Sequence, residues 1–154
     1  MRASWPTLAA FLLAACVGVP LAPPDRDAAA KRFDPPRPGL AALYVVREGS
    51  FVTAPLAVLV DQRPAGALGH DSYLRVELAP GWHDVRARDL DTGRQLAATN
   101  IQLDVGDIRF VSLANAVLET PLTSTMTEVS AREVPAPQGR AAVASRRLAA
   151  SREL

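Results

Sequence analysis

The residue best suited to chemistry in this chain is Cys16, the only cysteine, which follows a short apolar run and two small residues. The stretch Leu13-Ala14-Ala15-Cys16 has the form of a cleavage site that ends in cysteine. After cleavage between Ala15 and Cys16, the thiol could carry a diacylglyceryl thioether and the freed amine an acyl chain. The motif therefore predicts lipidation at Cys16 and a chain that is anchored to a membrane without spanning it.

Two histidines beside acidic residues are the second place where the sequence could support chemistry. His70 precedes Asp71, and His83 precedes Asp84. A histidine and two carboxylates can bind zinc when they converge, so the loops around His70, Asp71 and His83 form a candidate site for a metal or a small ligand. In the competing interpretation, which we favour, His83 follows a Pro-Gly turn and bonds a backbone group at a sheet edge.

Other patterns that accompany catalysis are absent from the sequence or have a structural explanation. No Gly-x-Ser-x-Gly and no Gly-x-x-x-x-Gly-Lys motif occurs. The paired aspartates at 89 and 91 and at 104 and 107 bracket turns, where aspartate side chains bond nearby backbone donors. We therefore expect that the protein is not an enzyme and that it binds no cofactor.

The charge balance argues against a nucleic-acid partner. The chain has 17 basic and 16 acidic residues, whereas binding to a phosphate backbone relies on a concentrated basic patch. Arginines and acidic residues instead alternate along most of the chain. Because a single cysteine allows no internal disulfide, the fold must be stabilised by packing.

One group of aromatic and basic side chains could mediate protein contact. Tyr73 and Trp82 lie on either side of Ala79-Pro80-Gly81, in two runs where apolar and polar residues alternate. This pattern predicts a β-hairpin in which Tyr73 and Trp82 meet on the solvent-exposed face, with Arg75 and Arg86 nearby. The four residues would form either a stabilising cross-strand cluster or a contact patch for an envelope protein.

The elements that position these residues begin with residues 1–15, which have the composition of an export signal. Met1-Arg2 is basic and residues 5–13 are apolar, but this run is shorter than the roughly 20 residues that span a bilayer. With Cys16, the segment resembles a bacterial lipoprotein signal peptide, which implies export, lipid transfer to Cys16 and cleavage by the lipoprotein signal peptidase. Val17 is not the aspartate that resembles an inner-membrane retention signal, so we expect the periplasmic face of the outer membrane. The alternative is a plain secretory signal cut elsewhere.

Composition divides the rest of the chain into three parts. Residues 16–39 are rich in proline, which fixes φ and removes donors, and this predicts a tether between the lipid and the domain. Residues 40–130 form the folded domain. Residues 131–154 are rich in arginine and alanine, and the spacing from Gln138 onward predicts a C-terminal helix that docks on the sandwich edge or contacts anionic lipid.

The domain is predicted to be mainly β. Apolar runs with a period near two occur at 41–46, 56–60, 73–78, 82–88, 94–103, 108–115 and 121–129, and a shorter piece covers 65–68. The first run is apolar on both faces, as in a central strand. About seven short strands joined by hairpin-length turns predict an antiparallel β-sandwich, and the gaps are too short for the crossovers of a parallel sheet.

Several of these strand and turn residues resemble the DUF2846 group of bacterial lipoproteins. The resemblance rests on residues 42–47, 58–61, 72–73, 76–83 and 106–111, and it covers roughly residues 40–129. The turn is also similar to the Leu-x-Pro-Gly-x-His turn of PEGA-like β-sandwich modules. The likeness implies a periplasm-facing β-sandwich and brings no catalytic residues. We therefore expect a membrane-anchored lipoprotein that acts as a protein-interaction or envelope-structural module or, alternatively, binds a metal or small ligand.

Overall fold

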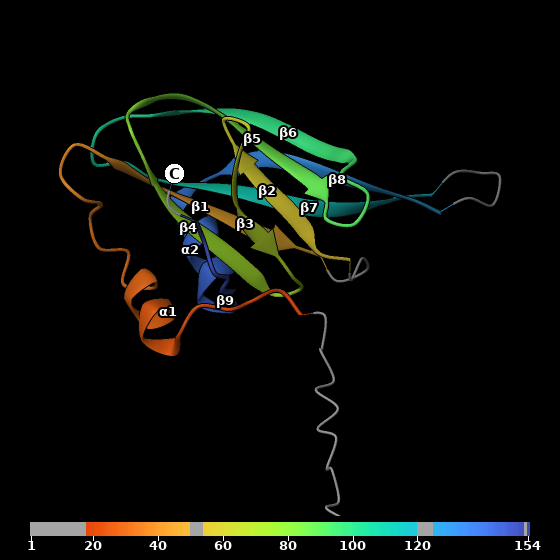
Figure 1. The fold of residues 1–154 in the computed structure, drawn as a ribbon, viewed down its shortest axis with the longest axis horizontal. Helices are drawn as coiled ribbons and strands as arrows, with labels where there is room; N and C mark the ends of the chain where they lie inside the picture. The colour runs from red at the N-terminus through yellow and green to blue at the C-terminus, as the bar shows by residue number, and fades with distance from the viewer. Residues whose placement is uncertain (1–17, 50–53, 120–124, 153) are drawn as a thin grey trace, which may run out of the picture.

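The described part of the chain forms a sandwich of two β-sheets with two short helices on its outside, as the computed structural model shows (Figure 1). The structure describes residues 18–49, 54–119, 125–152 and 154. Their elements are α1 (Pro24–Ala30), β1 (Ala41–Glu48), β2 (Leu56–Val60), β3 (Arg63–Leu68), β4 (Ser72–Leu78), β5 (Gly81–Asp89), β6 (Gln95–Leu103), β7 (Ile108–Glu119), β8 (Thr125–Val134), α2 (Ala136–Ala144) and β9 (Arg147–Leu148). One sheet has the order β8-β7-β1-β4-β9 and the other β3-β2-β5-β6. The mainly-β fold predicted from the sequence is confirmed.

The main core lies between the two sheets and follows from alternation along the strands. In β4, Leu74, Val76 and Leu78 point into this core, while the intervening side chains point to the other face of the sheet. β1 is buried on both faces from Ala41 to Arg47. The prediction that this strand is central is therefore confirmed.

The five-stranded sheet is mixed, so the prediction of a purely antiparallel sandwich is wrong. β1 pairs with β7 in parallel, and β4 pairs with β9 in parallel. The short gaps between strands do not exclude this pairing, because the chain between β1 and β7 passes through the whole second sheet and returns. The crossover consists of strands in place of a helix. The second sheet contains only antiparallel pairs among the described residues.

The hairpin predicted for the runs around the Pro-Gly turn is also wrong, because its two strands belong to different sheets. β4 pairs with β1 and β9, whereas β5 pairs with β2 and β6. Ala79 and Pro80 therefore lead the chain from one sheet to the other, and Gly81 has a φ of +138°. Alternation requires each strand to have a buried face, but it does not specify the neighbour with which the strand pairs.

The C-terminal region is helical over a shorter range than predicted. Residues 131–134 belong to β8, and after α2 the chain forms the short strand β9. α2 docks on the outer face of the five-stranded sheet through Ala142 and Val143. A Cβ at Gly139 would clash with the side chain of Phe110, so the absence of a side chain at this position allows the close approach of helix and sheet.

A second, aromatic layer fills the space between the two helices and the outer face of this sheet. Phe33, Tyr44, Tyr73 and Phe110 pack together, with ring centroids 5.2–6.1 Å apart in the four contacting pairs. Tyr44 donates a hydrogen bond to the carbonyl oxygen of Ala30 at the end of α1 (2.7 Å). The five-stranded sheet is therefore covered on both faces.

Candidate functional site

The proposed lipidation site, Cys16, and the cleavage position at Ala15 lie outside the described residues. The structure does show where the chain runs immediately afterwards. The Ala22 N–H donates to the Leu148 carbonyl (2.8 Å), the Ala150 N–H donates to the Pro20 carbonyl (2.9 Å), and Leu21 forms a β-bridge with Ala149. The chain is therefore bonded to the domain from Pro20 onward, in contrast to the tether predicted for residues 16–39.

Asp27 holds this N-terminal segment in place by accepting three hydrogen bonds. Its Oδ1 accepts the Tyr73 hydroxyl (2.8 Å) and the Leu148 N–H (2.9 Å), and its Oδ2 accepts the Lys31 ammonium (2.8 Å). Burial raises the pKa of Asp27, but these hydrogen bonds outweigh burial, so the pKa lies below its ordinary value of 3.8. Burial and the neighbouring carboxylate raise the pKa of Tyr73. α1 is thus attached to β4 and β9 through one carboxylate.

The four residues of the predicted contact patch do not share a face. Tyr73 is completely buried beneath α1, and Arg75 follows it on the same face of β4. Trp82 and Arg86 lie on β5, in the other sheet. Trp82 is 70% exposed and Arg86 is paired with Asp84 (2.7 Å). The expected group therefore divides into two pairs. Tyr73 and Arg75 lie on the face of β4 that α1 covers, and Trp82 and Arg86 lie on β5 in the second sheet.

The two histidines occupy separate environments. His83 Nε2 lies 2.8 Å from the Ala79 carbonyl oxygen, which confirms the predicted backbone contact, and its Nδ1 lies 2.7 Å from Asp61 Oδ2. His70 Nδ1 instead lies 2.7 Å from its neighbour Asp71. The described part of the chain contains no group of three or more His, Cys, Asp or Glu residues able to hold a metal ion.

The aspartates at the turns have the structural roles that the sequence predicts. Asp89 Oδ1 accepts the N–H groups of Asp91 (3.1 Å) and Thr92 (2.8 Å), and Asp107 Oδ2 accepts the N–H of Asp104 (3.1 Å). Sequence reasoning did not connect Asp61 with His83. Asp61 accepts the Asp84 N–H (3.0 Å), contacts His83, and lies in a two-residue turn with positive φ between β2 and β3. The aspartate in this turn was the usable sequence signal.

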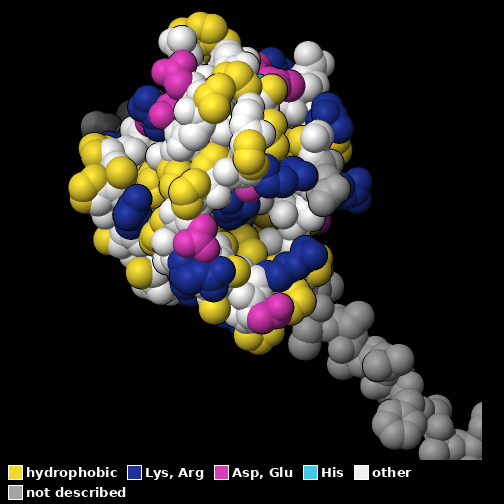
Figure 2. All heavy atoms as spheres, turned by 90° about the vertical axis from the view of Figure 1, so that its left-hand side faces the viewer, with side chains coloured by type: hydrophobic (Ala, Val, Ile, Leu, Met, Phe, Trp, Pro, Cys, Tyr) yellow, Lys and Arg dark blue, Asp and Glu magenta, His cyan; other side chains and the backbone are white. Residues whose placement is uncertain are grey.

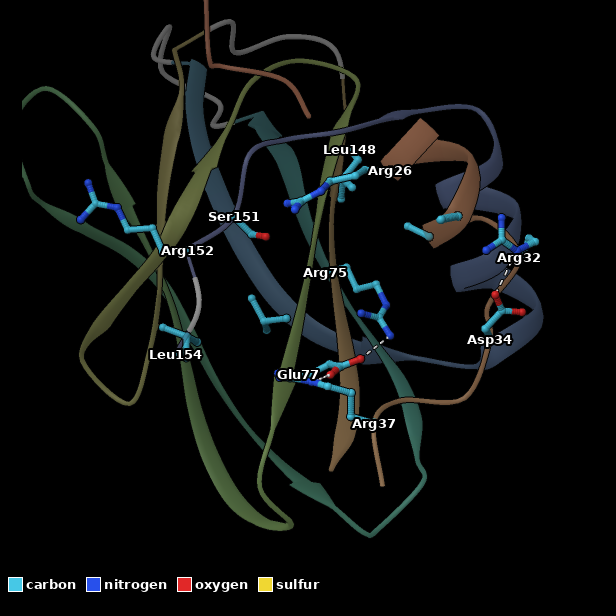
Figure 3. Close-up of a pocket in the computed structure, with 13 residues that line it drawn as sticks. Arg26, Arg32, Asp34, Arg37, Arg75, Glu77, Leu148, Ser151, Arg152 and Leu154 are labelled. Carbon is cyan, nitrogen blue, oxygen red and sulfur yellow. Dashed lines mark hydrogen bonds and ion pairs between the residues drawn. The ribbon is translucent and has the colours of Figure 1, made fainter. Parts of the chain in front are cut away.

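A groove of about 520 Å³ lies beside β4, between α1 and the C-terminal segment (Figure 3). We call it the arginine groove, because its charged lining consists of Arg26, Arg32, Arg37, Arg75 and Arg152 against Asp34 and Glu77. These arginines are scattered along the sequence, and nothing in their spacing predicts the groove. Figure 2, which looks at the side of the molecule that carries α1, shows basic side chains gathered over its middle and lower part.

Three of the arginines in the groove pair with a carboxylate, and Arg26 does not. Arg37 Nε (2.5 Å) and Arg75 Nη2 (2.8 Å) both donate to Glu77, and Arg32 donates to Asp34 (2.9 Å). Burial raises the pKa of Glu77, but the two guanidinium groups outweigh burial and lower it. The Arg26 side chain makes no hydrogen bond or ion pair with any described residue, and Figure 3 shows it extended over the groove, whereas Arg152 points away.

A smaller cavity of about 260 Å³ lies at the end of the sandwich where the described chain begins. It is lined by Gly18, Val19, Leu21, Pro55, Gly69, His70 and Ser72. His70 is therefore a neighbour of the segment that follows Cys16, and the lining supplies no second metal-binding side chain.

Within the described ranges, no helix is long and apolar enough to cross a membrane. The resemblance to the DUF2846 lipoproteins stays a prediction. No protein-family model matches the chain, and no curated protein matches it.

Proposed function

We propose that this protein is a lipid-anchored β-sandwich of the DUF2846 type, a non-enzymatic interaction module held at the periplasmic face of the bacterial outer membrane. The proposal combines the cleavage motif ending in Cys16 with the attachment of the following residues to the domain. It requires no metal or cofactor. The separation of His70 from His83 gives the metal-binding alternative no support.

The observation that carries the proposal is the bonding of residues 20–22 to residues 148–150. Only four residue steps separate Cys16 from Pro20, which corresponds to at most about 14 Å of extended chain. A lipid on Cys16 would therefore hold the end of the sandwich that carries Leu21 and His70 close to the membrane. This arrangement differs from a domain displayed on a long flexible arm.

The opposite end of the sandwich would then face the periplasm. β4 has seven residues, about 20 Å at the usual rise of a strand, and it separates Ser72, beside the first described residues, from the turn that leads to Trp82. Trp82 is 70% exposed and Val105 is 62% exposed. Exposed apolar side chains at the distal end are suited to contact with an envelope partner.

The anchor is tested by replacing Cys16 with serine and measuring partition into detergent. We expect Cys16→Ser to move the protein from the detergent phase to the aqueous phase, whereas Val17→Ser should leave partition unchanged. A Cys16→Ser protein that stays in the detergent phase would refute the lipid anchor.

The orientation of the domain on the membrane can be tested with tryptophan fluorescence. Cleavage before Cys16 would leave Trp82 as the one tryptophan of the mature chain. In vesicles that contain brominated phospholipids, Trp82 fluorescence should be unquenched. A nitroxide attached at Leu21→Cys should instead contact the headgroups. Strong bromine quenching of Trp82 would reverse the proposed orientation.

The interaction role is tested by site-specific photo-crosslinking from position 82 in intact envelopes. We expect one discrete adduct, and Trp82→Ala should reduce co-purification of that same partner without changing the unfolding midpoint. A matched photo-crosslinker at the exposed position 132, on β8, is the control. Equal adducts from both positions would remove the support for a specific contact.

A further inference from the structure

The edge of the five-stranded sheet at β4 is only partly paired. The carbonyl oxygen of Asp71 accepts the Arg147 N–H (3.1 Å), and that of Tyr73 accepts the Ala149 N–H (2.8 Å). Pairing with β9 ends at Tyr73. Because alternate residues of a strand direct their backbone groups to the same edge, Arg75 and Glu77 direct their N–H and C=O groups to this edge. No described residue hydrogen bonds to them there.

The groove exists because the C-terminal segment leaves β4 at this point. After Ala149 the chain crosses to the other sheet, where Ser151 forms a β-bridge with Gly66 and the Arg152 N–H donates to the Ala65 carbonyl (2.8 Å). Figure 3 shows the segment passing away from β4, with Arg75 and Glu77 on the other side of the gap. The unpaired backbone groups therefore face the groove of about 520 Å³.

The charge of the groove restricts what can occupy it. Five arginines line it against two acids, although the whole chain is almost neutral. Arg26 has no described partner, and Arg37 and Arg75 share the single carboxylate Glu77. An occupant that carries carboxylates is therefore favoured over a neutral or basic one.

We propose that the arginine groove binds an extended acidic peptide segment of an envelope protein, which adds as a strand to the free edge of β4 at Arg75 and Glu77. The proposal rests on the interaction role proposed above and is independent of the lipid anchor. Backbone pairing supplies affinity, and contact of acidic side chains with Arg26 and Arg75 supplies specificity. A lipid phosphate fits less well, because its oxygens accept hydrogen bonds but do not pair with the alternating N–H and C=O groups of the edge as a peptide backbone does.

The test uses the full chain in zwitterionic detergent micelles and the synthetic peptide Thr-Glu-Val-Glu-Thr-Glu-Val. The exchange rates of the Arg75 and Glu77 backbone amides are measured by NMR. We expect the peptide to slow exchange at both amides, and a version with lysine in place of glutamate to bind about tenfold more weakly. A version with N-methylated alternate amides should not protect the β4 amides, because it lacks the donors that pair with the edge.

Two matched variants test the groove itself. Arg26→Glu should weaken binding of the acidic peptide about fivefold or more, whereas Arg132→Glu, which changes another exposed arginine, on β8, should not change it. Equal weakening by both variants, protection of amides away from β4, or equal binding of the N-methylated peptide would each overturn the proposal. Protection of the same amides by phosphatidylglycerol vesicles but not by the peptide would also overturn it and would identify a lipid site.

This test separates the two proposals. If the peptide fails to bind while position 82 still crosslinks to one partner, the groove proposal is wrong and the interaction role stands. If the peptide binds as expected but Cys16→Ser leaves the protein in the detergent phase, the groove is supported and the anchor is refuted.

Discussion

The five-stranded sheet is buried on both of its faces, but different kinds of contact bury them. On the inner face, aliphatic side chains such as Leu43, Val45 and Leu74 meet the second sheet. On the outer face, the aromatic layer meets α1 and α2, and the Tyr44 and Tyr73 hydroxyls need partners on α1. Apolar burial is non-directional, whereas a buried hydroxyl must be hydrogen bonded. The outer layer therefore depends on one docked segment and the inner core does not.

This difference matters for the proposed function, because α1, one of the two helices that cover the outer face, belongs to the segment that follows Cys16. A disturbance of α1 would change the position of the domain relative to its proposed lipid and would also open the arginine groove, which α1 lines through Arg26 and Ala29. A disturbance of the inner core would instead unfold the sandwich as a whole.

The largest effect is expected in the inner core. Leu43→Ala removes a fully buried side chain at the centre of β1, and a substitution of this kind costs about 2–5 kcal/mol. Urea denaturation should show this loss together with one cooperative transition for both faces. The exposed Val105→Ala serves as the control and should stay within about 0.5 kcal/mol of the parent. A loss for Leu43→Ala as small as that of the control would contradict the assignment of the inner core.

The outer layer should respond locally. Asp27→Ala leaves the Tyr73 hydroxyl and the Leu148 N–H without their acceptor, at a cost of about 1–3 kcal/mol. Hydrogen exchange of the Ala22 and Leu148 amides should quicken while the β2 and β5 amides remain protected. Asp25→Ala, an exposed position in the same helix, is the control. Equal loss of protection in both sheets would show that the outer layer is not a separate unit.

Removing only the hydroxyl should have a smaller effect. Tyr73→Phe retains the ring contact with Tyr44 and removes the donor to Asp27. We expect a loss of about 1 kcal/mol in chemical denaturation. In the Asp27→Ala background the same substitution should cost less, because the hydroxyl has already lost its acceptor. Full additivity would argue against the hydrogen bond.

The smallest expected effect is a difference in acid sensitivity between the two faces. The pKa of Asp27 lies below the 3.8 expected for the unfolded chain, so its stabilising contribution is complete above pH 3.8 and is lost as the pH falls through the lower, folded-state pKa. Exchange at the Ala22 and Leu148 amides should therefore quicken in this acid range before the aliphatic core opens. Asp27→Asn should remove most of this pH dependence, and an unchanged profile would contradict the role of Asp27.

The sequence predicted the strands better than it predicted their partners. The runs at 41–46, 56–60 and 73–78 are strands in the structure, and the turn aspartates bond the backbone as expected. The Pro-Gly turn was interpreted as a hairpin because two alternating runs flank it, yet the same pattern suits a connection between two sheets. Both arrangements bury the same apolar faces, so local alternation does not distinguish them.

The N-terminal segment and the arginine groove show the same limit in the candidate site. Prolines 20, 23, 24, 35, 36 and 38 indicate a chain that avoids regular structure, and they are compatible with a packed segment as well as with a free tether. Which of the two occurs depends on Asp27 meeting Tyr73 and Leu148, residues that are far away in the sequence. The groove likewise combines Arg26, Arg75 and Arg152, whose spacing carries no local signal.

The sequence by itself determined the mainly-β class, the central position of β1, the turn positions and the prediction of a lipid on Cys16. These properties follow from the backbone period, from turn chemistry and from a short contiguous motif, all of which act over a few neighbouring residues. Only the tertiary structure decided the parallel pairing of β1 with β7, the docking of α1 and the free edge of β4 beside the arginines. Those features depend on contacts between distant segments, and their free energy is shared among many residues, so no single stretch of sequence encodes them.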